Sequence, residues 1–364
     1  IGYNRMNFRW GNVGTFQMNP GSHMNQIQTH YYGDEPIPIT VCFGLPVAAT
    51  LLAGGGYDYV VLPRGGDERG AAGAVQGFPM RLVKARTVDA YAVADSELVL
   101  EGLLYPRDKR WETKESEDAG IQGRFPFHPE WAGYMGKAYR PPTFHVTAIT
   151  MRKGSGAKRP FIYPMGVHMY DCNNIDTTVR EAAIYELCER IQPGLVHDVN
   201  IPFPMTDYGG CVIQVKKRPH FKTDDAWVRN FLTATMATSS GMRLAIAVDT
   251  DVDIYSMDDI IWCLTTRVNP KDDVWSPTPG GMGQTFIPAE RLSAGDKQWT
   301  AMNIHFAGGM AIDATVPVGF ESDFMRPVYP IDRVDPAHWF GSDEIARAKS
   351  LMKGWAEVLS RTGQ

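Results

Sequence analysis

The chain has 364 residues, of which 44% are hydrophobic and 21% are charged, as in an ordinary folded protein of two or three domains. The formal net charge of -5 and the absence of any run of Lys or Arg exclude a general nucleic-acid binder. No segment is apolar for long enough to span a bilayer, and five cysteines without a C-x-x-C pair favour reduced thiols in the cytoplasm.

Short apolar runs bounded by turn-forming residues predict strands over the first 160 or so residues. Three of these runs are Pro38–Phe43, Met80–Val83 and His145–Thr150. Residues 48–52 predict a helical turn that ends at the glycines 54–56. The heavily charged stretch Asp108–Asp118 predicts a solvated loop.

Beyond residue 165 or so, strand and helix patterns alternate, which predicts an α/β layer. Apolar residues recur every fourth position in Thr177–Ile191, as on one face of a helix, and Arg243–Val248 predicts a buried strand. Ser256 resembles the start of a capping box and predicts a helix over Asp258–Val268. Ser342–Arg361 has the apolar spacing of a helix, which would pack within the chain or on a second subunit.

Three polar residues of the N-terminal half form a candidate metal site. Asn12, His23 and Glu68 offer an amide oxygen, an imidazole and a carboxylate, a set suited to Mg²⁺ or Mn²⁺. Read alone, the pattern is weak, because nine histidines and 41 acids offer many such sets. A single histidine is more often a hydrogen-bonded structural residue.

A series of motifs in a fixed order resembles the UbiD family of prenylated-flavin (de)carboxylases. Asn12-Val-Gly-Thr-Phe-Gln17 resembles the family's Asn-x-Gly-x-Tyr-Arg, and Ser22-His-Met-Asn-Gln-Ile27 resembles its Gln-His-Ile-Arg-Gln-Ile. Further similar stretches follow in the family's order over about 300 residues, and they are Asp34–Gly44, Ala72–Gly77, Leu98–Gly102, Val248–Ile254, Ile260–Pro270 and Ala311–Thr315. Individually several are common peptides, but their shared order is specific.

The resemblance implies a cofactor and its metal. Asn12, His23 and Glu68 fall on the family's ligands for Mn²⁺ or Mg²⁺, sometimes accompanied by K⁺, which bridge to the phosphate of prenylated FMN. A buried dianionic phosphate requires such cationic compensation. The residues that match the cofactor-lining positions are Thr15, Phe16, Gln17, Ser22, His23, Gly54 and Gly55.

The segment Arg124–Tyr134 is similar to the family's Glu-Gly-Pro-Phe-Gly-Glu-x-x-Gly-Tyr motif. Glu130 matches the second glutamate, which the resemblance makes the proton-transfer residue, although it could also be an exposed loop residue. Phe125 stands where the first glutamate would be, and Gln17 stands where the family has arginine. Gln17 could hydrogen-bond the substrate or the flavin, and His128 is a candidate substitute proton relay.

The fold implied by the resemblance is a mixed α+β and α/β architecture. We expect a split β-barrel flavin- and metal-binding domain over residues 1–160, an α/β domain over 161–330 and a C-terminal helical tail over 331–364. The family's further N-terminal segment is expected to be missing. Homo-oligomers are usual in the family.

The implied function is reversible decarboxylation or carboxylation of an aromatic, heteroaromatic or conjugated acid, with CO₂ as the other reactant. A flavin prenyltransferase would supply the cofactor. The alternative is a noncatalytic or cofactor-holding subunit of a multi-subunit aromatic carboxylase, which the absence of the arginine and the first glutamate favours. A third alternative, an FMN reductase on a split barrel, predicts oxidation of NAD(P)H.

Overall fold

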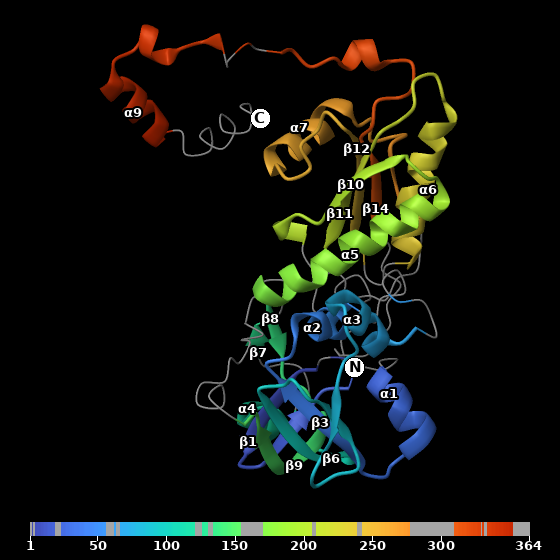
Figure 1. Ribbon diagram of the computed structural model, residues 1–364, viewed down its shortest axis with the longest axis vertical. Coiled ribbons are helices and arrows are strands. Elements are labelled where there is room, and N and C mark those ends of the chain that lie inside the picture. Colours follow the sequence, from blue (N-terminus) through green and yellow to red (C-terminus); the bar gives the residue numbers. More distant parts are fainter. Residues whose placement is uncertain are drawn as a thin grey trace. The chain divides into compact units, whose positions relative to one another are not determined.

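The computed structural model describes residues 2, 4–18, 23–55, 62, 66–120, 126–129, 134–153, 170–205, 209–238, 242–276, 309–328, 330 and 333–351. The chain divides into two compact units, residues 1–318 and residues 319–364. The larger unit contains two five-stranded sheets (Figure 1). None of the described helices combines the length and the apolar character that crossing a membrane requires.

The N-terminal sheet has the strand order β1-β2-β9-β6-β3, and each neighbouring pair is antiparallel. Its strands are β1 (Met6–Trp10), β2 (Val13–Phe16), β3 (Ile37–Phe43), β6 (Leu98–Lys109) and β9 (Pro142–Met151). Strands β1 and β3 form its two edges, so the described part of the sheet is open. The barrel closure expected from the sequence is not found among the described strands.

Gly102 allows the close approach of two strands of this sheet, and one apolar face forms its core. A Cβ added at Gly102 would lie 2.2 Å from the carbonyl oxygen of His145, so only glycine allows β6 to approach β9 this closely. The ladder between these strands is irregular at this point, between Glu101 and Gly102. The buried residues that form the core of the sheet are Phe16, Ile37, Leu100, Leu104 and Phe144.

Short helices and hairpins accompany the N-terminal sheet. The helices are α1 (His23–Ile27), which continues into the π-helical turn η1 (Gln28–Tyr32), α2 (Val47–Gly55) and α3 (Glu68–Gln76). The hairpins pair β4 (Leu82–Lys84) with β5 (Tyr91–Val93) and β7 (Pro126–Pro129) with β8 (Met135–Lys137). Helices α2 and α3 pack through small residues, and Ala48, Leu52 and Ala72 are buried there.

The charged stretch 108–118 is not the solvated loop that its composition predicted. Strand β6 runs on to Lys109, and helix α4 (Lys114–Ala119) follows. Thr113 caps this helix by accepting a hydrogen bond from the backbone of Ser116, and Lys114 pairs with Asp118 one turn later. The capping signal was present in the sequence, but the density of charge obscured it.

The second sheet lies in the α/β part of the larger unit and has the order β10-β11-β12-β14-β13. Its strands are β10 (Val196–Asn200), β11 (Gly210–Val215), β12 (Leu244–Asp249), β13 (Val274–Trp275) and β14 (Met310–Asp313). The three central strands β11, β12 and β14 are parallel, and the two outer strands run antiparallel to their neighbours. The 3₁₀ turn η3 (Phe203–Met205) follows β10.

Helices cover both faces of this second sheet, as Figure 1 shows. Helices α5 (Tyr170–Ile191) and α6 (Thr223–Thr238) bury Ile184 and Phe231 against one face, where Ile213 points. Helix α7 (Met257–Arg267) buries Ile260 against the other face, where Ile246 points. Alternate residues of the central strands thus enter separate apolar cores, which explains their nearly continuous hydrophobic sequence.

The smaller unit contains the 3₁₀ turns η4 (Glu321–Phe324) and η6 (Pro336–His338) and helix α9 (Ser342–Leu351). Helix α9 confirms the start of the predicted C-terminal helix, and residues 352–361 of that prediction lie outside the described residues.

Candidate functional site

Asn12, the first predicted metal ligand, occupies the turn between β1 and β2. Its backbone carbonyl accepts a hydrogen bond from the Val146 N–H at 2.9 Å, and its side-chain Nδ2 donates to the Val146 carbonyl at 3.1 Å. These bonds anchor the residue to β9. They engage the amide nitrogen and leave the amide oxygen as the atom that a cation could bind.

His23 and Glu68, the other two predicted ligands, are in contact. Nδ1 of His23, at the start of α1, lies 2.8 Å from Oε1 of Glu68 in the first turn of α3. The side chain of His23 is half exposed, whereas that of Glu68 is only 13% exposed. Two residues that are 45 positions apart in the sequence are therefore in contact.

The donor set fits a hard divalent cation. Two adjacent ligands of an octahedral ion with bonds of about 2.1 Å are separated by about 3 Å, close to the His23–Glu68 separation. Among the described residues, no group of three or more His, Cys, Asp and Glu could hold a metal. A site here would therefore depend on the neutral oxygen of Asn12 or on a bound phosphate for its remaining ligands.

Thr15 and Phe16, predicted to line the cofactor, have buried side chains. The Thr15 hydroxyl is directed to the Asn7 carbonyl at 3.4 Å, and the ring of Phe16 lies 6.4 Å from that of Phe144 in the sheet core. Gln17 follows directly, and its N–H donates to the Arg5 carbonyl at 3.0 Å. Any cofactor contact at Thr15 or Phe16 would thus involve the backbone.

The other predicted lining residues are Gly54 and Gly55, which end α2, and Ser22, which lies outside the described residues. Glu130, the predicted proton-transfer residue, and Phe125, which stands at the position of the family's first glutamate, also lie outside them. His128 belongs to strand β7, although the structure does not describe its side chain.

An open hollow of about 630 Å³ borders helix α3, which carries Glu68. Asp67 and Arg69 line it together with the small residues Gly70, Gly73 and Ala74 of the helix. The volume is within the usual range for small-molecule pockets. Asp67 caps α3 by accepting the Arg69 N–H, and its hydrogen bonds with Arg69 hold its pKa below the ordinary value.

Sequence reasoning missed a buried ion pair close to Gln17. Arg5 Nε donates to Glu112 Oε1 at 3.0 Å, and Arg5 Nη2 pairs with Glu112 Oε2. The Glu112 side chain is fully buried, and that of Arg5 is 11% exposed. Because the partners are 107 residues apart, no local sequence pattern indicates this pair.

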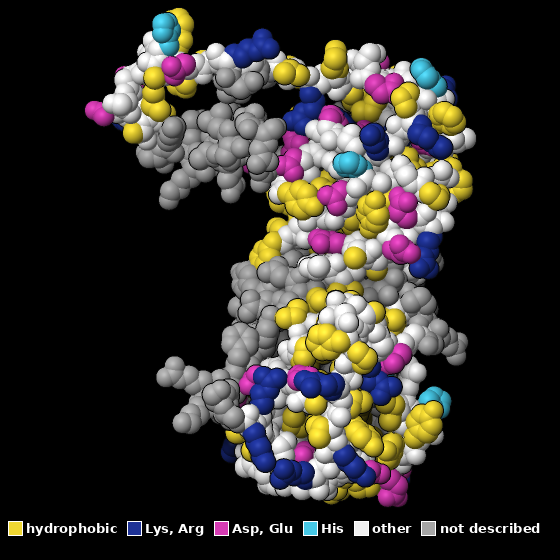
Figure 2. Space-filling model, in the orientation of Figure 1, with side chains coloured by type: hydrophobic (Ala, Val, Ile, Leu, Met, Phe, Trp, Pro, Cys, Tyr) yellow, Lys and Arg dark blue, Asp and Glu magenta, His cyan; other side chains and the backbone are white. Residues whose placement is uncertain are grey.

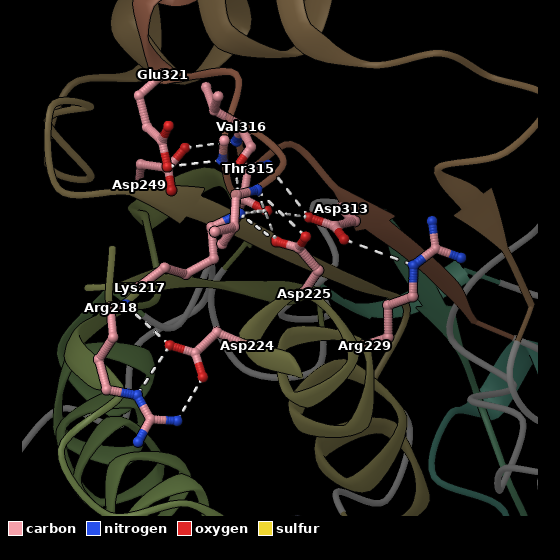
Figure 3. A network of polar contacts seen from close by, with 12 residues as sticks. Lys217, Arg218, Asp224, Asp225, Arg229, Asp249, Asp313, Thr315, Val316 and Glu321 are labelled. Carbon is pink, nitrogen blue, oxygen red and sulfur yellow. Dashed lines mark hydrogen bonds and ion pairs between the residues drawn. The ribbon is translucent and has the colours of Figure 1, made fainter. Parts of the chain in front are cut away.

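A second polar network lies at the carboxyl ends of the parallel strands of the second sheet (Figure 3). Lys217 Nζ, almost fully buried, donates to Asp225 at 2.9 Å, to Thr315 at 3.0 Å and to the Val316 carbonyl. Asp313 accepts from the Thr315 hydroxyl at 2.6 Å. Burial raises the pKa of Asp313, and it raises the pKa of Asp249, at the end of β12, to about 6.

Many basic side chains of the N-terminal part are neutralised locally. Figure 2 shows Lys and Arg side chains gathered over this part, with acids beside several of them. The ion pairs include Arg81 with Asp95, Arg152 with Glu97 and Arg107 with Asp34. These basic side chains therefore do not form a surface of uncompensated positive charge.

Two family models match most of the chain. Residues 1–166 match the 3-octaprenyl-4-hydroxybenzoate carboxy-lyase Rift-related domain (UbiD), and residues 173–314 match the corresponding C-terminal domain (UbiD_C). The gallate decarboxylase of Lactiplantibacillus plantarum is 30% identical over 319 residues, which is 86% of this chain and 61% of that protein. A relative from Archaeoglobus fulgidus is 23% identical and is covered over 59% of its length. The chain therefore spans less than two thirds of these relatives.

Solved structures show the same fold. The apo 3,4-dihydroxybenzoic acid decarboxylase (AroY) of Klebsiella pneumoniae is similar with a TM-score of 0.72 and 25% identity, over 93% of this chain and 67% of that chain. An evolved dimeric form of the UbiD-class enzyme HmfF from Pelotomaculum thermopropionicum, in complex with prFMN, has a TM-score of 0.67. At 20% identity, over 93% of this chain and 66% of that chain, it supports the fold alone. From both family models and the gallate decarboxylase relative it follows that the chain belongs to the UbiD family.

Proposed function

We propose that this chain catalyses the reversible decarboxylation or carboxylation of an aromatic, heteroaromatic or conjugated acid with prenylated FMN. The observation that carries the proposal is the 2.8 Å contact between His23 and Glu68, two residues that the motif order assigns to one metal site. The gallate and 3,4-dihydroxybenzoic acid decarboxylases among its relatives favour a phenolic aromatic acid as substrate.

The cofactor site would be built on β2 and the first turns of α1 and α3. Asn12, His23 and Glu68 would hold Mn²⁺ or Mg²⁺, with K⁺ as a further ion, against the phosphate of the flavin. Residues that would contact the flavin are Thr15, Phe16, Gln17, Ser22, His23, Gly54 and Gly55. When bound, prenylated FMN would supply the electron-accepting centre at which the carbon–carboxylate bond is broken or made.

Within this site, Gln17 would hydrogen-bond the substrate or the flavin without adding charge. Glu130 would move the proton at the carbon that exchanges CO₂, and His128, next to the half-buried Phe127 on β7, would be the alternative proton relay. A carboxyl group held against aromatic rings favours its neutral form, as a general acid requires.

For the domain organisation we propose a flavin- and metal-binding domain over residues 1–160, of the split-barrel type, an α/β domain over 161–330 and a helical tail over 331–364. The assembly we propose is a homo-oligomer in the cytoplasm that receives its cofactor from a flavin prenyltransferase. The vanillic acid decarboxylase ShVdcCD of Sedimentibacter hydroxybenzoicus, of which one structure contains a truncated ShVdcD, has a similar fold, so further subunits are consistent with the proposal.

The test is reconstitution. The chain is produced together with a flavin prenyltransferase, its visible spectrum and metal content are measured, and exchange of ¹³CO₂ into a panel of phenolic and conjugated acids is followed. The proposal predicts cofactor absorbance, about one divalent ion per chain and exchange with at least one acid. Cofactor absorbance without exchange on any acid would instead identify a cofactor-holding subunit, and oxidation of NAD(P)H would identify a reductase.

The proton-transfer assignment has a separate test. Glu130→Gln keeps the shape of the side chain but cannot readily donate a proton. General acid–base groups contribute about 10²- to 10⁴-fold in rate, so this variant should retain the cofactor and turn over at least about a hundredfold more slowly. Turnover close to the parent's, with solvent deuterium still entering the product, would reject Glu130 and favour His128.

A further inference from the structure

The buried pair Arg5–Glu112 joins distant parts of the N-terminal sheet. Arg5 directly precedes β1, and Glu112 lies between β6 and α4. Both oxygens of Glu112 accept hydrogen bonds from the guanidinium, which gives the bidentate geometry that fixes orientation as well as distance. Because both charged groups lose most of their hydration, the free energy of desolvation offsets much of their attraction, and the pair is weak evidence for a role in stability alone.

On one side, the pair contacts the strand that leads to the proposed proton-transfer residue. The guanidinium carbon of Arg5 lies 5.1 Å from the ring centroid of Phe127 on β7 and 5.1 Å from that of Tyr139. Oε2 of Glu112 also accepts the N–H of Tyr139 at 2.8 Å. A cation over an aromatic face is attracted to it, so Arg5 holds Phe127, the residue before His128, against the sheet.

On the other side, the pair is tied to Gln17. The β1–β2 register pairs Met6 with Phe16, which places Arg5 opposite Gln17, and the Gln17 N–H donates to the Arg5 carbonyl. Directly opposite residues of an antiparallel pair project from the same face of the sheet. Asn7, two residues further along this face, also reaches the pair, because its Nδ2 donates to the Glu112 carbonyl at 2.7 Å.

We propose that the Arg5–Glu112 pair is a positioning unit that fixes strand β7, which directly precedes the proposed proton-transfer residue in the sequence, relative to Gln17. This inference rests on the proposed function. Arg5 acts through Phe127 and the Gln17 backbone, because its own charge is already engaged by Glu112. Arg5 also brings a guanidinium to the position opposite Gln17 on the neighbouring strand. Gln17 itself stands where the family has arginine.

The neighbouring pair Arg9–Glu117 is the control, although it is less buried, with side chains 20% and 48% exposed. It connects β1 with α4, through Arg9 Nη2 and Glu117 Oε2, and the Arg9 guanidinium also lies over an aromatic ring, that of Trp10 at 4.8 Å. Its described contacts do not include β7. Breaking either pair removes one ion pair between residues 5–9 and residues 112–117, but only the first removes a contact with Phe127.

The experiment compares Arg5→Lys with Arg9→Lys. Lysine keeps the charge and much of the ion pair, but it loses the bidentate fork and the planar stacking. Two measurements are made: hydrogen exchange of peptides that cover β7 and β8 in the protein without cofactor, and kcat and KM of the reconstituted protein with an acid that the parent converts. Cofactor content and the unfolding temperature are recorded for each variant.

For Arg5→Lys we expect parental cofactor content, a KM within about twofold and a kcat lower by about 10- to 100-fold, because small misplacements of reacting groups have effects of this size. Exchange in β7–β8 should be faster, and Arg9→Lys should match the parent in both measurements. A kcat within twofold of the parent's, or losses that match those of Arg9→Lys, would overturn the proposal. If the parent converts no acid, exchange alone decides: acceleration confined to β7–β8 supports the positioning role, and unchanged exchange rejects it.

Discussion

The carboxyl group of Asp249 should make the α/β part less stable as the pH rises, the opposite of what an ion-paired carboxylate does. Asp249 ends β12, and its Oδ2 accepts the Val316 N–H at 2.6 Å and lies 3.3 Å from Nη1 of Arg267. Burial nevertheless dominates and raises the pKa of Asp249 from the ordinary 3.8 to about 6. The folded chain thus binds this proton more tightly than the unfolded chain does.

The sign and size of the effect follow from linkage. Between pH 3.8 and about 6 the folded state carries more of this proton than the unfolded state, so the free energy of unfolding falls as the pH rises. At about 1.4 kcal/mol for each pKa unit, the full loss above pH 6 is about 3 kcal/mol. Asp249→Asn removes this titration, while its amide oxygen can still accept the Val316 N–H.

The assay is urea unfolding of parent and variant, followed by circular dichroism at several pH values from 4 to 8. The difference in the free energy of unfolding, variant minus parent, should rise by about 2 to 3 kcal/mol over this range. Any cost of the substitution that does not depend on pH cancels from this rise. A difference that stays constant or falls with pH would refute the role assigned to burial.

Asp224→Asn is the control. Hydrogen bonds from Arg218 hold the pKa of Asp224 below 3.8, so the stability from that pair is present above pH 3.8 and is lost only as the pH falls through the lower folded value. The difference between Asp224→Asn and the parent should therefore stay nearly constant between pH 5 and 8. A rise like that of Asp249→Asn would point to a general effect of removing acids.

Three further predictions address the site and the core. Glu68→Gln removes the anionic side chain of the proposed metal site and should sharply lower metal and flavin content, measured by metal analysis and absorbance; unchanged contents would show that the site is wrongly placed. Gln17→Arg adds a charge at the proposed substrate or flavin contact and should change the relative kcat/KM of several acids, whereas identical kinetics would count against Gln17 facing the substrate. Phe231→Ala, at a fully buried position of α6, should lower the free energy of unfolding by about 3 to 5 kcal/mol in urea titrations, and a loss under 1 kcal/mol would contradict that packing.

Elements with strong local patterns could be predicted from the sequence. The Thr177–Ile191 pattern is confirmed as the C-terminal part of α5, which begins earlier, at Tyr170. Ser256 caps α7 through the Asp259 N–H, as the capping signal predicted, although the Asp259 carboxylate accepts the N–H of Asp253. Helix α4 was missed because its high charge resembled that of a loop.

The candidate site could be predicted only in part, because its contacts are far apart in the sequence. The motif order brought together His23 and Glu68, which are in contact, and it named Asn12, whose amide is anchored to β9. The partnership of Arg5 with Glu112 could not be foreseen, since it joins residues that are 107 positions apart in the sequence. Long-range pairing of this kind has no periodic signature in a single sequence.

The ladder between β2 and β9 has a consequence for how the chain folds during synthesis. Val13 pairs with His145, so the β1–β2 hairpin cannot join its sheet until β9 has left the ribosome. At about 5 to 20 residues per second, this delay lasts roughly 10 s, during which strand β2 lacks its second partner strand. Strand β3 pairs with β6 much sooner, at a separation of 67 positions between Ile37 and Leu104. Among the described strands of this sheet, the hairpin next to Asn12 and Gln17 is therefore exposed longest to chaperones and to mispairing before its sheet is complete.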